Sequence, residues 1–228
     1  MMQLVIGNKN YSSWSMRPWV LMKQLGLHFE EVKLRLDFAP HSAFKRTVAH
    51  FSPAGLVPVL LDDDFAVWDT LAILEYLNDK FPGRDILPED IRERARARSL
   101  ASEMHSGFSA LRSHCPMNIE ARLPEVGARL WTEQAGVRAN VERIEVMWVD
   151  ALNASGGPFL FGPFGAVDAM YAPVATRLVT YGLPMSPTVK AYVERLLAAP
   201  GPAAWIADAL KEHDFIAEDE PYRSAPAR

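Results

Sequence analysis

The chain has 228 residues, of which 49% are hydrophobic and 23% charged, and its formal net charge is −4 at pH 7. This is the balance of a globular protein with a sizeable core, and it argues against intrinsic disorder and against a nucleic-acid partner. No apolar run approaches the roughly 18 residues that cross a bilayer, and the single cysteine, Cys115, excludes an internal disulfide and a cysteine-rich metal site. We therefore expect a cytoplasmic protein that uses no metal and does not enter a membrane.

The first 80 residues alternate short strands with helices. Short apolar or period-two runs predict strands at Leu4–Ile6, Val32–Leu36, Val57–Leu61 and Phe65–Trp68. Between them we expect a helix with Pro18 in its first turn and Gly26 at its end, a weak helix or turn over 41–49, and a helix over 70–81. The order β-α-β-α-β-β-α predicts a small mixed sheet with helices packed against it.

The remainder of the chain reads as helix after helix beyond a turn-rich linker at 81–88. One apolar stripe runs from Ala97 to Leu111 and predicts a long helix. Further helices are expected over 137–151, 168–181, 187–199 and 203–213. The charged tail from Glu218 is expected to be mobile. We expect two domains, residues 1–82 and residues 89–228.

Four short segments carry a resemblance to a known family: Ser12–Arg17, Ser52–Pro58, Trp68–Thr70 and Phe164–Asp168. With these segments in this order, the chain resembles the cytosolic glutathione transferases over essentially its whole length. Its first loop is most similar to the zeta class. The resemblance implies a thioredoxin-like domain that binds glutathione as co-substrate, followed by a helical bundle that lines the electrophile site, and it implies a homodimer.

The implied activity is attack of the glutathione thiol on a small electrophile, as in detoxification, with isomerase or peroxidase side reactions. A non-catalytic binding or assembly module of the same fold is the alternative, and binding to immobilised glutathione would help to separate the two. The resemblance also implies that Asp168 caps the central helix and has a structural role.

Hydroxyl groups cluster at the start of the first helix, on Tyr11, Ser12, Ser13 and Ser15. Lowering a thiol pKa of about 8.5 by two units requires that the thiolate be stabilised by about 2.7 kcal/mol. One hydroxyl that donates to a charged acceptor supplies about 1.5–3 kcal/mol, so a single serine is sufficient. By resemblance to the zeta pattern Ser-Ser-Cys-Ser-x-Arg, Ser12 is the thiol partner and Ser13 its close rival. Trp14 stands where that pattern has Cys, which argues against disulfide exchange. Alternatively, the serines only cap the helix.

Two further elements are implied to hold the peptide part of glutathione. Val57-Pro58 resembles the cis-proline element of thioredoxin-like folds, which presents the backbone of the preceding residue to the cysteinyl backbone. Asp69-Thr70 precedes a helix and forms an anion site suited to the γ-glutamyl carboxylate. An ordinary trans proline and a plain helix cap are the alternatives.

The electrophile site carries no motif. His105 and Arg112 are seven residues apart, so on one long helix they would share a side, and they are candidates to face the substrate; a solvated helix face is the alternative. Leu56 stands where relatives carry a Lys or Gln near the glycine end of glutathione. Three side chains could supply that cation: His41, Lys45 and Arg46.

Overall fold

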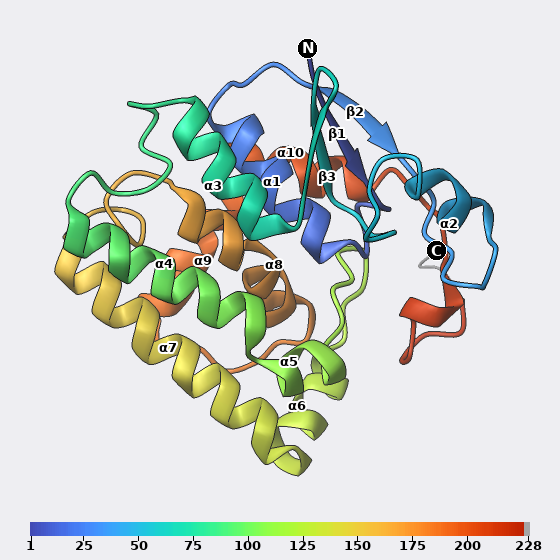
Figure 1. Ribbon diagram of the computed structural model, residues 1–228. Coiled ribbons are helices and arrows are strands. Elements are labelled where there is room, and N and C mark those ends of the chain that lie inside the picture. Colours follow the sequence, from blue (N-terminus) through green and yellow to red (C-terminus); the bar gives the residue numbers. More distant parts are fainter. Residues whose placement is uncertain (226–228) are drawn as a thin grey trace.

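The computed structural model describes residues 1–225 and begins with a four-stranded mixed sheet in the order β2-β1-β3-β4. The strands are β1 (Met2–Ile6), β2 (Glu30–Lys33), β3 (Val59–Asp62) and β4 (Phe65–Trp68). Strand β1 pairs in parallel with β2 and antiparallel with β3, and β3 pairs antiparallel with β4. Helices α1 (Ser13–Gln24), α2 (Ala43–Val48) and α3 (Thr70–Lys80) connect or follow the strands. The expected thioredoxin-like order is confirmed (Figure 1).

Helices make up the second part of the chain, and Figure 1 shows α4 and α7 side by side along one edge of it. They are α4 (Ile91–Ser106), α5 (Ser109–His114), α6 (Pro124–Glu133), α7 (Ala135–Ser155), α8 (Ala166–Thr180), α9 (Pro187–Ala198) and α10 (Pro200–Ala209). Helix α8 is buried along almost its whole length. Within residues 1–225, no helix has the length and apolar character needed to cross a membrane.

The buried start of α8 is held by Asp168. Its carboxylate accepts hydrogen bonds from the Gly165 N–H at 3.0 Å, the Leu160 N–H at 3.1 Å and the Tyr192 hydroxyl at 2.8 Å. Burial nevertheless outweighs these donors and raises the pKa of Asp168 to about 6. The carboxylate is thus a cap for α8, in agreement with the expected structural role.

Helix α1 joins the two parts of the molecule because it packs against both α8 and α10. The close approach to α10 needs Gly201, where a Cβ would lie 2.3 Å from the Val20 carbonyl oxygen. The Gly201 N–H also donates to the side chain of Gln24 at 2.9 Å. One continuous hydrophobic cluster therefore runs from the sheet through α1 into the helices.

Pro18 is not in the first turn of α1, as expected from the sequence, but inside the helix, which begins at Ser13. A proline lacks the N–H that would bond the carbonyl four residues earlier. The carbonyl of Trp14 is therefore released from the helix, and it accepts a hydrogen bond from the Thr70 hydroxyl at 3.2 Å. An interior proline thus links the start of α1 to the start of α3.

The long helix expected through Leu111 is interrupted. Helix α4 ends at Ser106, and Phe108 takes a left-handed conformation with a φ of 54° before α5 begins. His105 and Arg112 consequently lie on different helices, and the expectation that they share one helix side is wrong. The apolar stripe did not reveal this break because Phe108 and Leu111 remain buried after the chain turns.

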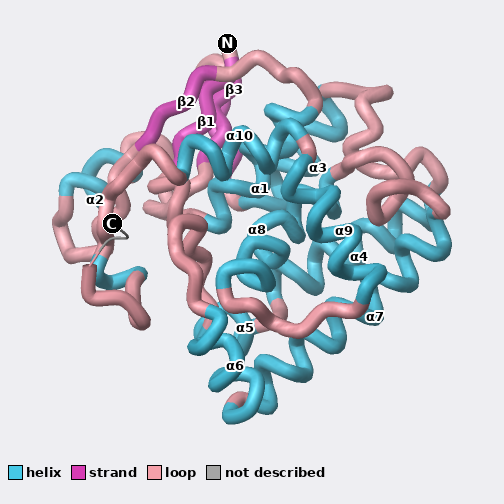
Figure 2. Tube along the Cα trace, turned by 180° about the vertical axis from the view of Figure 1, so that it is seen from behind, coloured by secondary structure: helices cyan, strands magenta, loops and turns pink. Residues whose placement is uncertain are grey.

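The tail from Glu218 is ordered rather than mobile through the described residues. Glu220 is 6% exposed and accepts hydrogen bonds from Tyr11 and Arg223. Arg223 also forms an ion pair with Glu120 at 2.9 Å. The views in Figures 1 and 2 both place this C-terminal segment beside α2, although the two are far apart in the sequence.

Candidate active site

A cleft of about 320 Å³ lies where α1, α3 and α4 meet the start of β3. Its lining residues are Trp14, Ala54, Leu56, Val57, Pro58, Trp68, Asp69, Thr70 and His105. The Val57–Pro58 peptide bond is cis, in agreement with the resemblance. No hydrogen bond from another of residues 1–225 engages the Val57 N–H or C=O, so both groups are available to an extended ligand.

Asp69 and Thr70 form the start of α3 at the edge of this cleft. Asp69 has a φ of 75°, and its carboxylate caps the helix by accepting from the Leu71 N–H at 2.8 Å. A positive φ on a residue other than glycine is a strained conformation that clusters at functional sites. The first-turn amide groups of a helix have no intrahelical acceptor and favour anions. The arrangement can bind a carboxylate.

Ser12 and Ser13 lie side by side at the start of α1. Ser12 occupies the cap position, yet its side chain makes no cap hydrogen bond. Its hydroxyl instead donates to the Ser15 hydroxyl at 2.7 Å, and Ser15 also accepts a hydrogen bond from the Gly7 N–H. Ser13 accepts a long hydrogen bond of 3.4 Å from Arg177. The interpretation of Ser12 as a plain helix cap is therefore wrong.

Tyr11 has a different environment, although it is adjacent in sequence. Its hydroxyl donates to Glu220 at 2.7 Å, and burial together with this bond raises the pKa of Tyr11 to about 12. The tail and the backbone of Ile216 thus engage the phenol. Tyr11 is poorly placed to donate to a thiol.

Trp14 brings together the groups proposed for the electrophile. Its ring contacts His105 edge-on at 5.2 Å, and the guanidinium carbon of Arg112 lies 5.0 Å from the ring centroid. His105 Nε2 is 3.3 Å from a carboxylate oxygen of Asp69, while its Nδ1 is buried without a partner among residues 1–225. Arg112 donates to the Gly107 carbonyl at 3.2 Å, which holds it at the end of α4.

Two buried arginines behind Ser13 escaped the sequence analysis as candidates. Arg17 was noted only as part of the first motif, and Arg177 lies in the apolar stretch that predicted α8. An arginine within an otherwise apolar helix is a usable signal, because charged residues are rarely buried without a partner. The identity of that partner, however, depends on tertiary structure.

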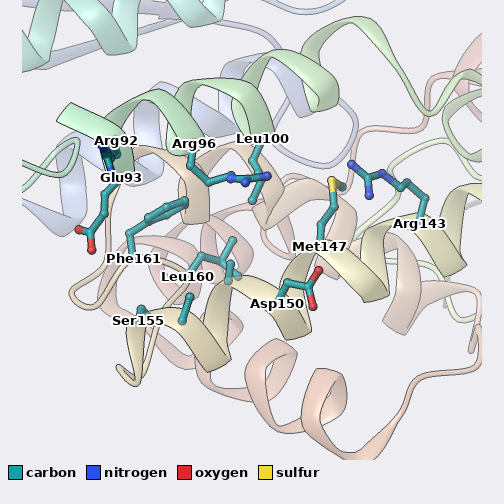
Figure 3. A pocket seen from close by; sticks show the side chains of 12 residues that line it. Arg92, Glu93, Arg96, Leu100, Arg143, Met147, Asp150, Ser155, Leu160 and Phe161 are labelled. Atoms are coloured by element: carbon teal, nitrogen blue, oxygen red, sulfur yellow. The ribbon is translucent and has the colours of Figure 1, made fainter. Parts of the chain in front are cut away.

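A larger cavity, of about 520 Å³, lies elsewhere, between α4 and α7. Figure 3 shows side chains of both charge signs around it, Arg92, Glu93 and Arg96 from α4 and Arg143 and Asp150 from α7. It contains none of the residues of the cleft. Among residues 1–225, no three His, Cys, Asp or Glu side chains are grouped to hold a metal ion.

Comparison with known proteins relates the chain to the glutathione transferases. Residues 11–80 match the model of the glutathione S-transferase N-terminal domain. The chain is 28% identical to glutathione S-transferase 1 of Dianthus caryophyllus, over 81% of each chain. It is 24% identical to maleylacetoacetate isomerase of Rattus norvegicus, over 77% of each.

A solved structure agrees with these matches along almost the whole chain. A glutathione transferase homologue from Burkholderia, with bound glutathione, is 25% identical and superposes with a TM-score of 0.68 over 92% of this chain and 98% of its own. The cis-proline element, the cap of α3 and the serine-bearing start of α1 occur here on that same fold. Residues 11–80 therefore carry the glutathione S-transferase N-terminal domain, and the chain as a whole has the fold of the glutathione transferases.

Proposed function

We propose that the enzyme binds glutathione in the cleft at the cis-proline and lowers the pKa of its thiol with Ser12 or Ser13 for attack on a small electrophile. The observation that carries the proposal is the uncapped start of α1, where the side chain of Ser12 makes no cap bond while its hydroxyl is connected to Ser15. A hydroxyl at this position can donate to a thiolate beside the positive end of the α1 dipole.

The peptide part of glutathione is assigned to residues 1–82. The N–H and C=O of Val57, exposed by the cis bond to Pro58, pair with the cysteinyl backbone. The γ-glutamyl carboxylate binds at Thr70, and the Asp69 carboxylate pairs with the γ-glutamyl ammonium. Trp14 forms the wall of the cleft between them. Glutathione is a co-substrate here, and no metal is required.

Lys45 is the best candidate for the glycine carboxylate of glutathione. Its ammonium lies 3.4 Å from the Gly55 carbonyl, next to Leu56, which lines the cleft. The side chain of Arg46 is engaged with the carbonyl of His41. Lys45 is therefore the cation that can reach the glycine carboxylate of glutathione by a change of its own side-chain rotamer.

The reaction breaks the S–H bond, with the proton released to solvent, and forms a bond between sulfur and carbon of the electrophile. In an addition the π bond of an unsaturated substrate opens and the resulting carbanion takes a proton from solvent, and in a substitution the leaving group departs with its bonding electrons. The helical domain, residues 89–228, supplies the pocket for the second substrate. His105 and Arg112, brought to Trp14 from two helices, face that substrate and favour an anionic or carbonyl-bearing one. The likeness to a maleylacetoacetate isomerase supports such a substrate class.

The test separates an enzyme from a binding module. Glutathione affinity is measured by calorimetry, and thiolate formation by ultraviolet titration of the complex. The proposal expects binding, a thiolate at neutral pH and turnover of a panel of electrophiles that includes unsaturated carboxylates. Binding with an unperturbed thiol and without turnover would instead identify a non-catalytic module.

A homodimer and a cytoplasmic location are proposed with this function. A two-fold axis brings the same surface of two subunits together. The mixed charges at the cavity between α4 and α7 could then pair across the interface (Figure 3). The cytoplasm is the compartment that suits a chain whose single cysteine is buried and free.

A further inference from the structure

Two buried guanidinium groups converge on Ser13 from different helices. Arg17, 1% exposed, donates from Nη1 to the Ser13 carbonyl at 2.8 Å and from Nε to the Met170 carbonyl at 2.9 Å. Arg177, 4% exposed, donates from Nη2 to the Ser13 hydroxyl at 3.4 Å. Ser13 is therefore contacted by positive charge on both its main chain and its side chain.

Neither guanidinium has an anionic partner among residues 1–225. The remaining bonds of Arg177 go to the carbonyls of Cys115 and Pro173, at 2.8 and 3.0 Å. Trp14 lies over Arg17, with the guanidinium carbon 4.2 Å from the ring centroid. Carbonyls and an aromatic face solvate these charges but do not neutralise them.

The titratable groups of residues 1–225 that face the two arginines also supply no carboxylate to balance their charge. They are the Arg112 guanidinium, the hydroxyls of Tyr171 and Tyr181, and the Cys115 thiol, with no carboxylate among those described. Burial lowers the pKa of Arg177, but only to about 10, so the group stays protonated at neutral pH. Burial also lowers the pKa of Arg17.

Buried charges in proteins are normally paired, because the loss of hydration is otherwise uncompensated. An enzyme can retain such a pair of cations when a ligand supplies the anion. The anion proposed for this site is the glutathione sulfur, since the proposed function assigns the thiol to Ser12 or Ser13. The carboxylates of glutathione are assigned to Thr70 and Lys45, on other elements.

We propose that Arg17 and Arg177 are positioning residues that supply the counter-charge of the glutathione thiolate through Ser13. This inference rests on the proposed function. The Arg177 bond occupies a lone pair of the Ser13 oxygen and leaves its proton free to donate to sulfur. Ionisation breaks only the S–H bond of glutathione, the proton goes to solvent, and no redox step is involved. The inference favours Ser13 over Ser12 as the direct donor.

The experiment compares Arg177→Gln and Arg177→Lys with the wild type. Gln removes the charge and keeps a hydrogen-bond donor, whereas Lys keeps the charge on a different head group. The thiol pKa of bound glutathione is measured by ultraviolet titration, and affinity is measured for glutathione and for S-methylglutathione, whose sulfur cannot ionise. Arg195→Gln, an exposed arginine on α9 that donates to the Pro158 carbonyl, is the matched control.

We expect Arg177→Gln to raise the thiol pKa by about one unit, which corresponds to about a tenfold loss of thiolate, and Arg177→Lys to restore most of it. Binding of S-methylglutathione should be unchanged in both. Equal losses for the two ligands, or an unchanged thiol pKa in a folded Gln variant, would overturn the inference.

If Arg177→Gln does not fold, Arg17→Gln gives a second test, because it removes the other buried charge and keeps a hydrogen-bond donor. An unchanged thiol pKa with weaker binding of both ligands would assign Arg17 a purely structural role. A raised thiol pKa in Ser13→Ala, together with wild-type thiol pKa values in the charge-removing arginine variants, would uphold the proposed function and reject only the arginine pair.

Discussion

Trp14 is the residue at which the proposed parts of the site meet. Its carbonyl accepts the Thr70 hydroxyl, and its ring lies between the Arg17 guanidinium and His105. A cysteine, which the zeta pattern has at this position, would provide neither the aromatic face nor its contact with a cation. Trp14 therefore supplies an aromatic contact surface in place of a reactive thiol, and the serines are the groups that we propose to act on the glutathione thiol.

The first prediction concerns those serines. Ser12→Ala or Ser13→Ala removes a hydroxyl donor to a charged sulfur, worth about 1.5–3 kcal/mol, which is one to two units of thiol pKa. Ultraviolet titration should show the thiolate in the wild type and its loss in one variant. Ser99→Ala, on the exposed face of α4, is the control. Wild-type titration curves in both single variants and in the double variant would remove both serines from the mechanism.

The second prediction concerns Thr70. Thr70→Val keeps the shape but removes the hydroxyl, whose single proton goes to the Trp14 carbonyl in the free protein and is proposed to turn to the γ-glutamyl carboxylate on binding, whereas Thr70→Ser keeps the hydroxyl. A charged acceptor left short of one bond costs about 1.5–3 kcal/mol, or about tenfold or more in affinity. Calorimetry should find weakened glutathione binding for Val and near-normal binding for Ser. Equal dissociation constants for the wild type and the Val variant would exclude Thr70 from the site.

At the scale of helices and strands, local patterns predicted most of what the chain forms. Periodicity and capping residues predicted β1, β3, β4 and α9, in which Ser186 accepts from the Val189 N–H. Strand β2 is Glu30–Lys33 and lies earlier in the chain than the predicted strand Val32–Leu36. The break at Phe108 and the ordered tail were not predictable, because each depends on contacts between residues far apart in sequence. The site divides in the same way, since its motifs are local while the approach of Arg177 to Ser13 spans 164 positions.

The third prediction tests the cap of α8. Asp168→Asn leaves one of the donors from Gly165, Leu160 or Tyr192 facing an amide N–H₂, which costs about 1–3 kcal/mol of unfolding free energy. Because the folded-state pKa of Asp168 is raised to about 6, the stability that this group contributes is complete below its unfolded pKa and falls as pH rises through about 6. The Asn variant lacks that loss.

Urea unfolding at pH 5 and pH 8 checks the prediction. The wild type should exceed the variant by more at pH 5 than at pH 8, and glutathione should stabilise both to the same extent. A gap that widens with pH would show that the hydrogen bonds, rather than burial, dominate the ionisation of Asp168.

At the scale of the whole molecule, the sheet and the helices are built around one core. The buried Lys9, in the loop before α1, forms ion pairs with Glu31 of β2 and Asp208 of α10, at 2.7 and 2.8 Å. The backbone amides of Lys9 and Asn10 donate to the carboxylate of Glu212. The loop that carries the serines is thus held from the far end of the chain.

The fourth prediction is that the protein is a two-fold dimer. Light scattering at micromolar concentration should report about twice the 25.5 kDa mass of the chain. Arg96→Glu, at the cavity between α4 and α7, should shift the mass toward that of the monomer, whereas Arg195→Glu on α9 should not. A mass near that of one chain for the wild type would contradict the dimer.

The position of α1 between the sheet and helices α8 and α10 also bears on how this protein can change over time. Residues 1–82 on their own would expose the apolar side of α1 that α8 and α10 cover. The N-terminal part therefore cannot simply be combined with the helical part of another protein. Exchanging the helical half for that of a relative should yield insoluble chimaeras unless Val20, Gln24 and Gly201 are matched as a set. New substrate preferences are therefore expected to arise by substitution around a retained core rather than by recombination at the linker.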